Sequence, residues 1–167
     1  TLTNGRTFVL FTSYSMMNNL AKRMEAFFTE NNLTLLLQGD GLPTLKMIEK
    51  FKSTERAVIF GTSSFWTGVD VPGDALSSVI IMRLPFANPD HPLEVARTER
   101  TTALGKNAFF DYTVPEAVLK FRQGFGRLIR TKDDTGIVVI LDSRIIQKRY
   151  GQTFLHSIPE CPVELID

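Results

Sequence analysis

The sequence predicts an α/β fold in which helices cover both sides of a mainly parallel sheet, a three-layer αβα arrangement. Short apolar runs alternate with longer segments of helical periodicity, the order that builds a parallel sheet. The runs are apolar at nearly every position, as expected for strands buried on both faces. No repeat, low-complexity tract or linker divides the 167 residues, so we expect residues 1–167 to form a single domain.

The elements follow from local patterns along the chain. Strands are expected at residues 7–12, 57–60, 79–82 and 137–141, with a further apolar run at 33–37. Helices are expected from a cap at Ser13 or Ser15 through Phe28, from Pro43 onward, near 93–104 and at 114–129. The helix that Pro43 opens should turn Leu45, Ile48 and Phe51 inward. Three prolines make residues 85–107 an irregular excursion from this pattern.

Composition excludes several classes of protein. One cysteine and two histidines, without ligand spacing, predict no metal site. No apolar run approaches the roughly 18 residues of a membrane span, so we expect no membrane partner. A net charge of +1 excludes a generally basic nucleic-acid coat, although eight basic and three acidic residues fall between 120 and 149. The first residue is threonine, so we expect a piece of a longer protein.

Polar, small-residue loops follow three of the expected strands, at residues 12–15, 38–41 and 61–73. In an open α/β sheet the carboxyl ends of the strands form the ligand-binding edge. Hydroxyls and backbone N–H groups there suit phosphate oxygens. The alternative is that these residues only form turns and caps. Three such loops at one edge favour a binding site.

The helix at 114–129 carries the most specific pattern. Gln123, Arg127 and Arg130 stand at i, i+4 and i+7, so they should share one helical face. Arginine forks match phosphate geometry, whereas the alternative is a solvated basic face. Gly124 and Gly126 each cost roughly 1 kcal/mol in a helix, which favours a close backbone approach at this point.

A phosphate-binding loop of the Gly-x-x-x-x-Gly-Lys-Ser/Thr type is missing. The one Gly-Lys pair, Gly105-Lys106, has Arg100 where the first glycine should stand and Asn107 where the hydroxyl residue should stand. The chain alone should therefore not hold a nucleoside triphosphate. This argues against a complete α/β transferase or kinase-like domain.

Three segments resemble motifs of a known family. Residues 9–14, 64–73 and 123–130 resemble motifs IV, V and VI of the C-terminal, RecA-like motor domain of DinG-type helicases. These belong to helicase superfamily two and are related to XPD. Residues 84–86, 89–92 and 109–112 are also similar to DinG sequences. Thr67 stands where the family commonly has glutamate.

The resemblance implies a RecA-like fold and a site shared between two motor domains. ATP and Mg²⁺ would be held mainly by an N-terminal motor domain of the same polypeptide, which would also carry any iron–sulfur cluster. Arg127 and Arg130 would reach the triphosphate across the cleft, one of them as an arginine finger. Gln123 would place the γ-phosphate or the attacking water.

The remaining site residues are also implied by the resemblance. Asp70 would accept from the ribose or the arginine network, and Gly68 and Gly126 would permit a close approach to the nucleotide. Four residues would contact single-stranded DNA: Ser13, Thr62, Ser63 and Trp66. Trp66 would stack on a base, with a place in the core as the alternative.

The expected function is the second motor domain of an ATP-dependent DNA helicase, with 5′ to 3′ translocation implied by the family. We expect the isolated chain to be inactive in ATP hydrolysis and the whole protein to lie in the bacterial cytoplasm. The alternative is a degenerate, non-catalytic module that binds nucleic acid or protein.

Overall fold

Five parallel strands form the centre of the fold. A computed structural model describes residues 3–67, 75–129 and 134–166. The sheet has the order β2-β3-β1-β4-β5, with every neighbouring pair parallel. The strands are β1 (Thr7–Leu10), β2 (Thr34–Leu37), β3 (Ala57–Gly61), β4 (Ser78–Ile81) and β5 (Ile137–Ile140). The predicted α/β fold with a parallel sheet is confirmed, and each predicted strand lies within one or two residues of the observed one.

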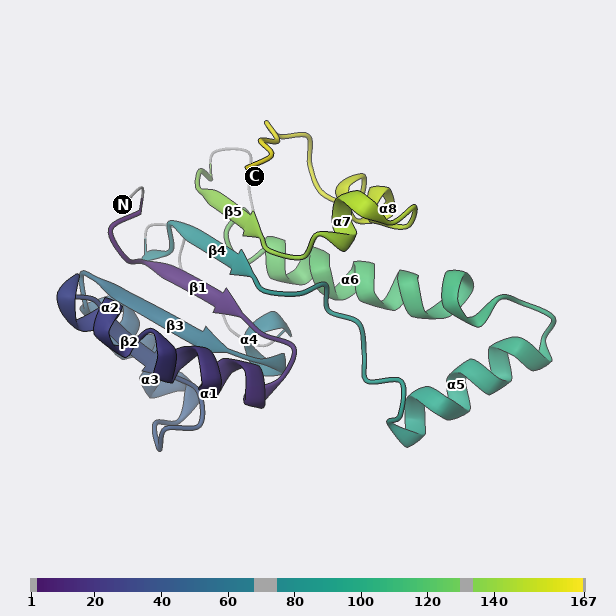
Figure 1. Cartoon of the computed structure of the whole chain (residues 1–167), viewed down its shortest axis with the longest axis horizontal. Helices are drawn as coiled ribbons and strands as arrows, with labels where there is room; N and C mark the ends of the chain where they lie inside the picture. The colour runs from purple at the N-terminus through teal and green to yellow at the C-terminus, as the bar shows by residue number, and fades with distance from the viewer. Residues whose placement is uncertain (1–2, 68–74, 130–133, 167) are drawn as a thin grey trace.

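Helices of different lengths connect the strands (Figure 1). They are α1 (Tyr14–Arg23), α2 (Glu25–Glu30), α3 (Thr44–Ser53), α4 (Ser63–Thr67), α5 (Pro92–Ala103), α6 (Val114–Phe125), α7 (Arg144–Gln147) and α8 (Gly151–Leu155), with a π-helical turn, η2 (Phe109–Thr113), before α6. Of the two predicted caps, Ser13 is the one that caps α1, since its Oγ accepts a hydrogen bond from the Met16 backbone N–H. The single helix predicted through Phe28 is interrupted at Met24, where ψ is 6°.

Leu45 does not face inward as predicted, since 79% of its surface is exposed. Met47, Ile48 and Phe51 form the buried face of α3. Successive residues turn by about 100° around a helix, so Met47 points roughly 200° away from Leu45. Burial of Met47 therefore turns Leu45 toward solvent.

The two faces of the sheet are covered unequally. One face packs against α3, α4, α6, α7 and α8 in the larger core. The other face packs against α1 and α2 in a smaller core that includes Val9, Val58 and Phe60 of β1 and β3. On this second face, the apolar residues at and just beyond β4 and β5 stay partly exposed; Leu141 is 58% exposed. Among the residues that the structure describes, the predicted cover on both sides is therefore incomplete over this part of the sheet.

The predicted excursion outside the sheet contains helix α5, which Figure 1 shows extending away from the strands. No residue of α5 is buried. Polar contacts join it to η2: the Tyr112 hydroxyl donates to Glu94 Oε2 at 2.9 Å, and Arg97 donates to the Tyr112 oxygen at 3.1 Å. No helix of the described residues is long and apolar enough to cross a membrane.

Candidate functional site

The carboxyl edge of β1, β2 and β3 is organised around Gln38, which follows β2 directly. Its Oε1 accepts from the Thr62 backbone N–H at 2.6 Å and from the Thr62 hydroxyl at 3.0 Å. Its Nε2 donates to the Tyr14 hydroxyl at 2.8 Å and to Ser64 Oγ at 2.9 Å. These four bonds use the full capacity of the amide. The predicted meeting of the three polar loops is therefore confirmed.

Sequence reasoning named the loop that contains Gln38 but assigned no role to this residue. Its position immediately after an apolar strand was the available signal. A polar side chain just beyond the end of a strand can reach the ends of the neighbouring strands. The side chain joins the loop after β1 to the loop after β3 through its bonds to Tyr14, Thr62 and Ser64.

The predicted DNA contacts divide into two groups. Thr62 is only 3% exposed, and both of its donors are bonded to Gln38, so in this structure it supports the loop rather than offering a donor to DNA. Ser13, at the start of α1, and Ser63, at the start of α4, are exposed on the same edge. Their contacts with DNA remain predictions.

Trp66 is a core residue, so the stacking role is corrected. None of its surface is exposed, and its indole N–H donates to the Phe11 carbonyl at 3.0 Å. Its ring lies against Gly124 of α6, where an added Cβ would be 2.6 Å from Cε3 of the indole. The close approach predicted at Gly124 is thus confirmed, and its partner is this side chain.

Arg127 lies beyond the end of α6, which ends at Phe125 with Gly126 as the cap. The helix predicted through residue 129 is therefore too long, because two glycines weaken the helix where it should continue. Arg127 Nε donates to the Trp66 carbonyl at 3.1 Å. This bond joins the segment that follows α6 to α4. Gly68, Asp70 and Arg130 lie outside the described residues.

Gln123 is exposed on α6 and lines a cavity of about 360 Å³ between this helix and residues 85–94. Lys120, three residues earlier, lines the same cavity together with Glu94 and Glu116. Burial lowers the pKa of Lys120. Sequence reasoning missed Lys120, although its spacing from Gln123 places both on one helical face.

Asp142 organises the edge of β4 and β5. Its buried carboxylate accepts from the Leu84 backbone N–H at 2.8 Å and forms a salt bridge with Arg144 at 2.6 Å. Burial raises the pKa of Asp142, but the bonds from the Arg144 side chain and from the two backbone N–H groups outweigh it, so the pKa lies below its ordinary value. The Arg144 guanidinium also sits 5.3 Å from the centre of the Phe86 ring. Together these contacts hold the segment after β5 against the segment after β4.

Metal ligands do not gather in the described part of the chain, where no group of three or more His, Cys, Asp or Glu residues could hold an ion.

Comparison with known proteins places this arrangement in context. A family model for the helicase C-terminal domain matches residues 1–161. The chain is 50% identical over 155 residues to the ATP-dependent DNA helicase YoaA of Haemophilus influenzae, covering 93% of this chain and 24% of that protein. It is 45% identical over 157 residues to the 3′-5′ exonuclease DinG of Bacillus subtilis, covering 93% of this chain and 17% of that protein. The chain thus spans a quarter or less of these relatives.

Solved structures agree on the fold. An XPD helicase matches 90% of this chain with a TM-score of 0.68 and 20% identity, and this chain covers 27% of that structure. The second domain of the DEAD-box helicase Mss116p, bound to an RNA duplex, matches 92% with a TM-score of 0.51 and 12% identity, covering 48% of that structure. At this identity the likeness supports the RecA-like helicase fold alone.

Proposed function

Since the chain belongs to the helicase C-terminal domain family, we propose that it is the second motor domain of an ATP-dependent DNA helicase of the DinG type. The observation that carries the proposal is the joining of three motif segments at one end of the sheet. Gln38 joins the segments that resemble motifs IV and V, and Arg127 joins the motif VI segment to α4. A motor domain needs such contacts between its loops, because nucleotide binding must move the groups that hold DNA.

The nucleotide role rests on the motif VI segment. Held through Nε at the Trp66 carbonyl, Arg127 is positioned beside the motif V segment. We propose that it and Arg130 meet a triphosphate held by the N-terminal motor domain, where an arginine stabilises the charge of the transition state. Gln123 orients the γ-phosphate or the attacking water. Gly126 lets the chain approach the nucleotide closely.

Gly68 and Asp70 complete the nucleotide side of the proposal, through the motif V segment that the sequence resembles. ATP and Mg²⁺ are bound mainly by the N-terminal motor domain, which also carries an iron–sulfur cluster where one exists. This division of labour explains why the chain has no phosphate-binding loop. The isolated chain is therefore expected to show no ATP turnover.

The DNA role rests on the exposed hydroxyls at the other part of the edge. Ser13 and Ser63 offer donors to the phosphates of single-stranded DNA, a mode of binding that does not read sequence. Gln38 acts as a positioning residue, because it holds the two loops that carry these serines. Translocation runs 5′ to 3′, and the whole protein works on DNA in the bacterial cytoplasm.

The test compares ATP turnover with DNA binding in the full-length protein. Arg127→Ala and Arg130→Ala should each lower DNA-stimulated turnover by about 10³-fold or more, with little change in the Kd for single-stranded DNA. Arg122→Ala is the matched control, since this exposed arginine on α6 has no assigned role. If both variants keep normal turnover, the segment is a solvated basic surface. If they lose DNA affinity instead, the arginines bind DNA and the nucleotide role is wrong.

A further inference from the structure

A row of aromatic rings runs from the larger core to the surface beyond the carboxyl end of β4. Phe121 and Phe154 are fully buried with ring centres 5.4 Å apart, and the Phe154 ring lies 5.8 Å from that of Phe86. Phe86 stacks at 6.1 Å on Phe109 of η2, which meets Phe110 edge-on at 5.2 Å. Phe109 is 39% exposed and Phe110 54% exposed, so this aromatic row ends in water.

The turn that carries the two exposed rings is fixed by local hydrogen bonds. Asn107 Oδ1 accepts from the Phe110 backbone N–H at 3.0 Å, and Asp111 Oδ2 accepts from the Asn107 backbone N–H at 2.8 Å. The turn is π-helical, a rare geometry that is frequent at functional sites. The backbone therefore holds the exposed end of the aromatic row in one place.

Two exposed cations directly precede another ring of the same group. The Tyr150 ring lies 5.5 Å from Phe86 and 5.4 Å from Phe109. Lys148 and Arg149 are exposed, and neither forms an ion pair with any residue that the structure describes. Residues 143–159 contain no aspartate or glutamate. Exposed aromatic rings beside free cations are the composition of single-stranded nucleic-acid sites.

The position of the aromatic row agrees with a DNA strand that crosses the sheet edge. Ser13 follows β1 and Ser63 follows β3, while Phe86 follows β4. Arg144, which follows β5, lies 5.3 Å from the centre of the Phe86 ring. Because all the strands are parallel, these segments share the carboxyl edge, and Figure 1 shows α7 and α8 on the side toward which β4 and β5 point. Neighbouring strands are about 4.8 Å apart, so a DNA strand leaving the serines reaches the rings within a few nucleotides.

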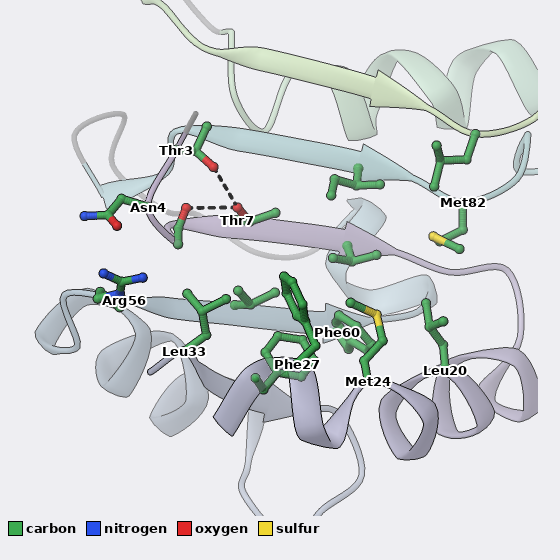
Figure 2. A pocket seen from close by; sticks show the side chains of 16 residues that line it. Thr3, Asn4, Thr7, Leu20, Met24, Phe27, Leu33, Arg56, Phe60 and Met82 are labelled. Atoms are coloured by element: carbon green, nitrogen blue, oxygen red, sulfur yellow. Dashed lines mark hydrogen bonds between the residues drawn. The ribbon is translucent and has the colours of Figure 1, made fainter. Parts of the chain in front are cut away.

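A second apolar surface lacks these features. The groove of about 440 Å³ beside α1 and α2 is lined by Leu20, Met24 and Phe27 among others (Figure 2). Its one charged lining residue among those described, Arg56, lies at the amino end of β3 and donates to the Asn31 carbonyl. The groove therefore offers no free cation at the carboxyl edge, and charge complementarity assigns the DNA to the aromatic row.

We propose that Phe109 and Phe110, together with Lys148 and Arg149, form a stacking platform for the bases of single-stranded DNA. This rests on the proposed function, in which the serine loops bind phosphates of the same strand, and adds a contact with the bases. Every base has a flat face that can stack on a phenylalanine ring, so the platform accepts any sequence. The two cations neutralise the phosphates that flank the stacked bases.

Equilibrium binding by the full-length protein tests the stacking. The probes are an oligothymidylate of about 20 nucleotides and an abasic strand of the same length. Phe110→Leu keeps an apolar side chain but removes the ring, so it should raise the Kd for oligothymidylate by about 5- to 150-fold and leave the Kd for the abasic strand unchanged. Phe110→Tyr keeps the ring and should bind both strands normally.

Leu93→Ala is the matched control, because Leu93 is a similarly exposed apolar residue on α5. It should bind both strands normally. Unchanged binding of oligothymidylate by Phe110→Leu would overturn the proposal and assign the rings to a protein partner. An equal loss of affinity for both strands would also overturn it, because the ring would then not meet the bases.

The salt dependence of the same Kd tests the cations. Lys148→Gln and Arg149→Gln should each lower the slope of log Kd against log salt by about 0.7, the value for one phosphate of a single strand. Lys52→Gln, exposed at the end of α3, should not change the slope. Unchanged slopes in all three variants would reject the cations as part of the platform.

ATP turnover by the wild type in the same preparations separates the platform from the proposed function. Normal DNA-stimulated turnover by the wild type, together with normal oligothymidylate binding by Phe110→Leu, rejects only the platform. A wild type without DNA-stimulated turnover contradicts the proposed function instead.

Discussion

Replacing Gln38 by alanine should loosen the carboxyl edge of the sheet. The substitution removes all four hydrogen bonds of the amide. Tyr14 is half exposed and Ser64 partly exposed, so both can turn to water. The Thr62 hydroxyl can rotate toward another acceptor, but the Thr62 backbone N–H cannot, because the residue is only 3% exposed.

One buried donor without a partner costs about 1–3 kcal/mol. Loss of this bond lowers the free energy needed to open the loop after β3 locally. The measurement is therefore amide hydrogen exchange at Thr62. Exchange there should speed up by roughly 5- to 150-fold in Gln38→Ala, with unchanged rates in the core of β1. Unchanged protection at Thr62 would refute the reasoning that Gln38 holds this loop.

Gln38→Glu separates the structural role from the DNA role. A carboxylate accepts from the same Thr62 donors, and the Tyr14 and Ser64 hydroxyls can turn to donate to it. Protection at Thr62 should therefore stay near the normal value. The added negative charge lies between the two loops proposed to hold DNA phosphates, so the Kd for single-stranded DNA should rise and should depend less steeply on salt.

Two further changes test the packing and the charge network. Gly124→Ala places a Cβ 2.6 Å from the Trp66 ring, and this overpacking should cost about 1–3 kcal/mol of folding free energy. The measurement is the Tm of the full-length protein, which should fall. Ala103→Gly on the exposed helix α5 is the control for effects of the backbone. Asp142→Asn should lower the free energy of unfolding at pH 7 by about 1–3 kcal/mol. Folding lowers the pKa of Asp142, so the carboxylate contributes fully to the free energy of unfolding above the ordinary pKa of 3.8, and this contribution is lost as the pH falls through the folded pKa. The wild type and the variant should therefore become equally stable in acid. A difference in stability that stays constant with pH would contradict the assigned contacts of Asp142.

Periodicity and strand composition were enough to predict where the strands lie along the chain and their parallel direction. The runs at Thr7–Leu10 and Ala57–Gly61 are buried along their whole length, which is the pattern of a central parallel strand. Helix ends were harder, because they depend on contacts between elements. The end of α6 at Phe125 follows from the two glycines, one of which is needed where the Trp66 ring packs.

The site was predicted in outline but not in its contacts. The polar loops after three strands pointed to one edge, and that edge exists. The choice between a buried and an exposed role for Trp66 could not be made from its neighbours in sequence, because burial depends on α6, which is distant in the chain. The same holds for Thr62, whose partner lies 24 residues away.

The central claim is that Arg127 acts on the triphosphate through its planar fork, and Arg127→Lys tests it most directly. Lysine keeps the positive charge but loses the bidentate geometry and the Nε donor that reaches the Trp66 carbonyl. In single-turnover ATP hydrolysis by the full-length protein with single-stranded DNA, the rate constant should stay at least about 10²-fold below normal, with an unchanged Kd for DNA. Hydrolysis at the normal rate in Arg127→Lys would contradict the account.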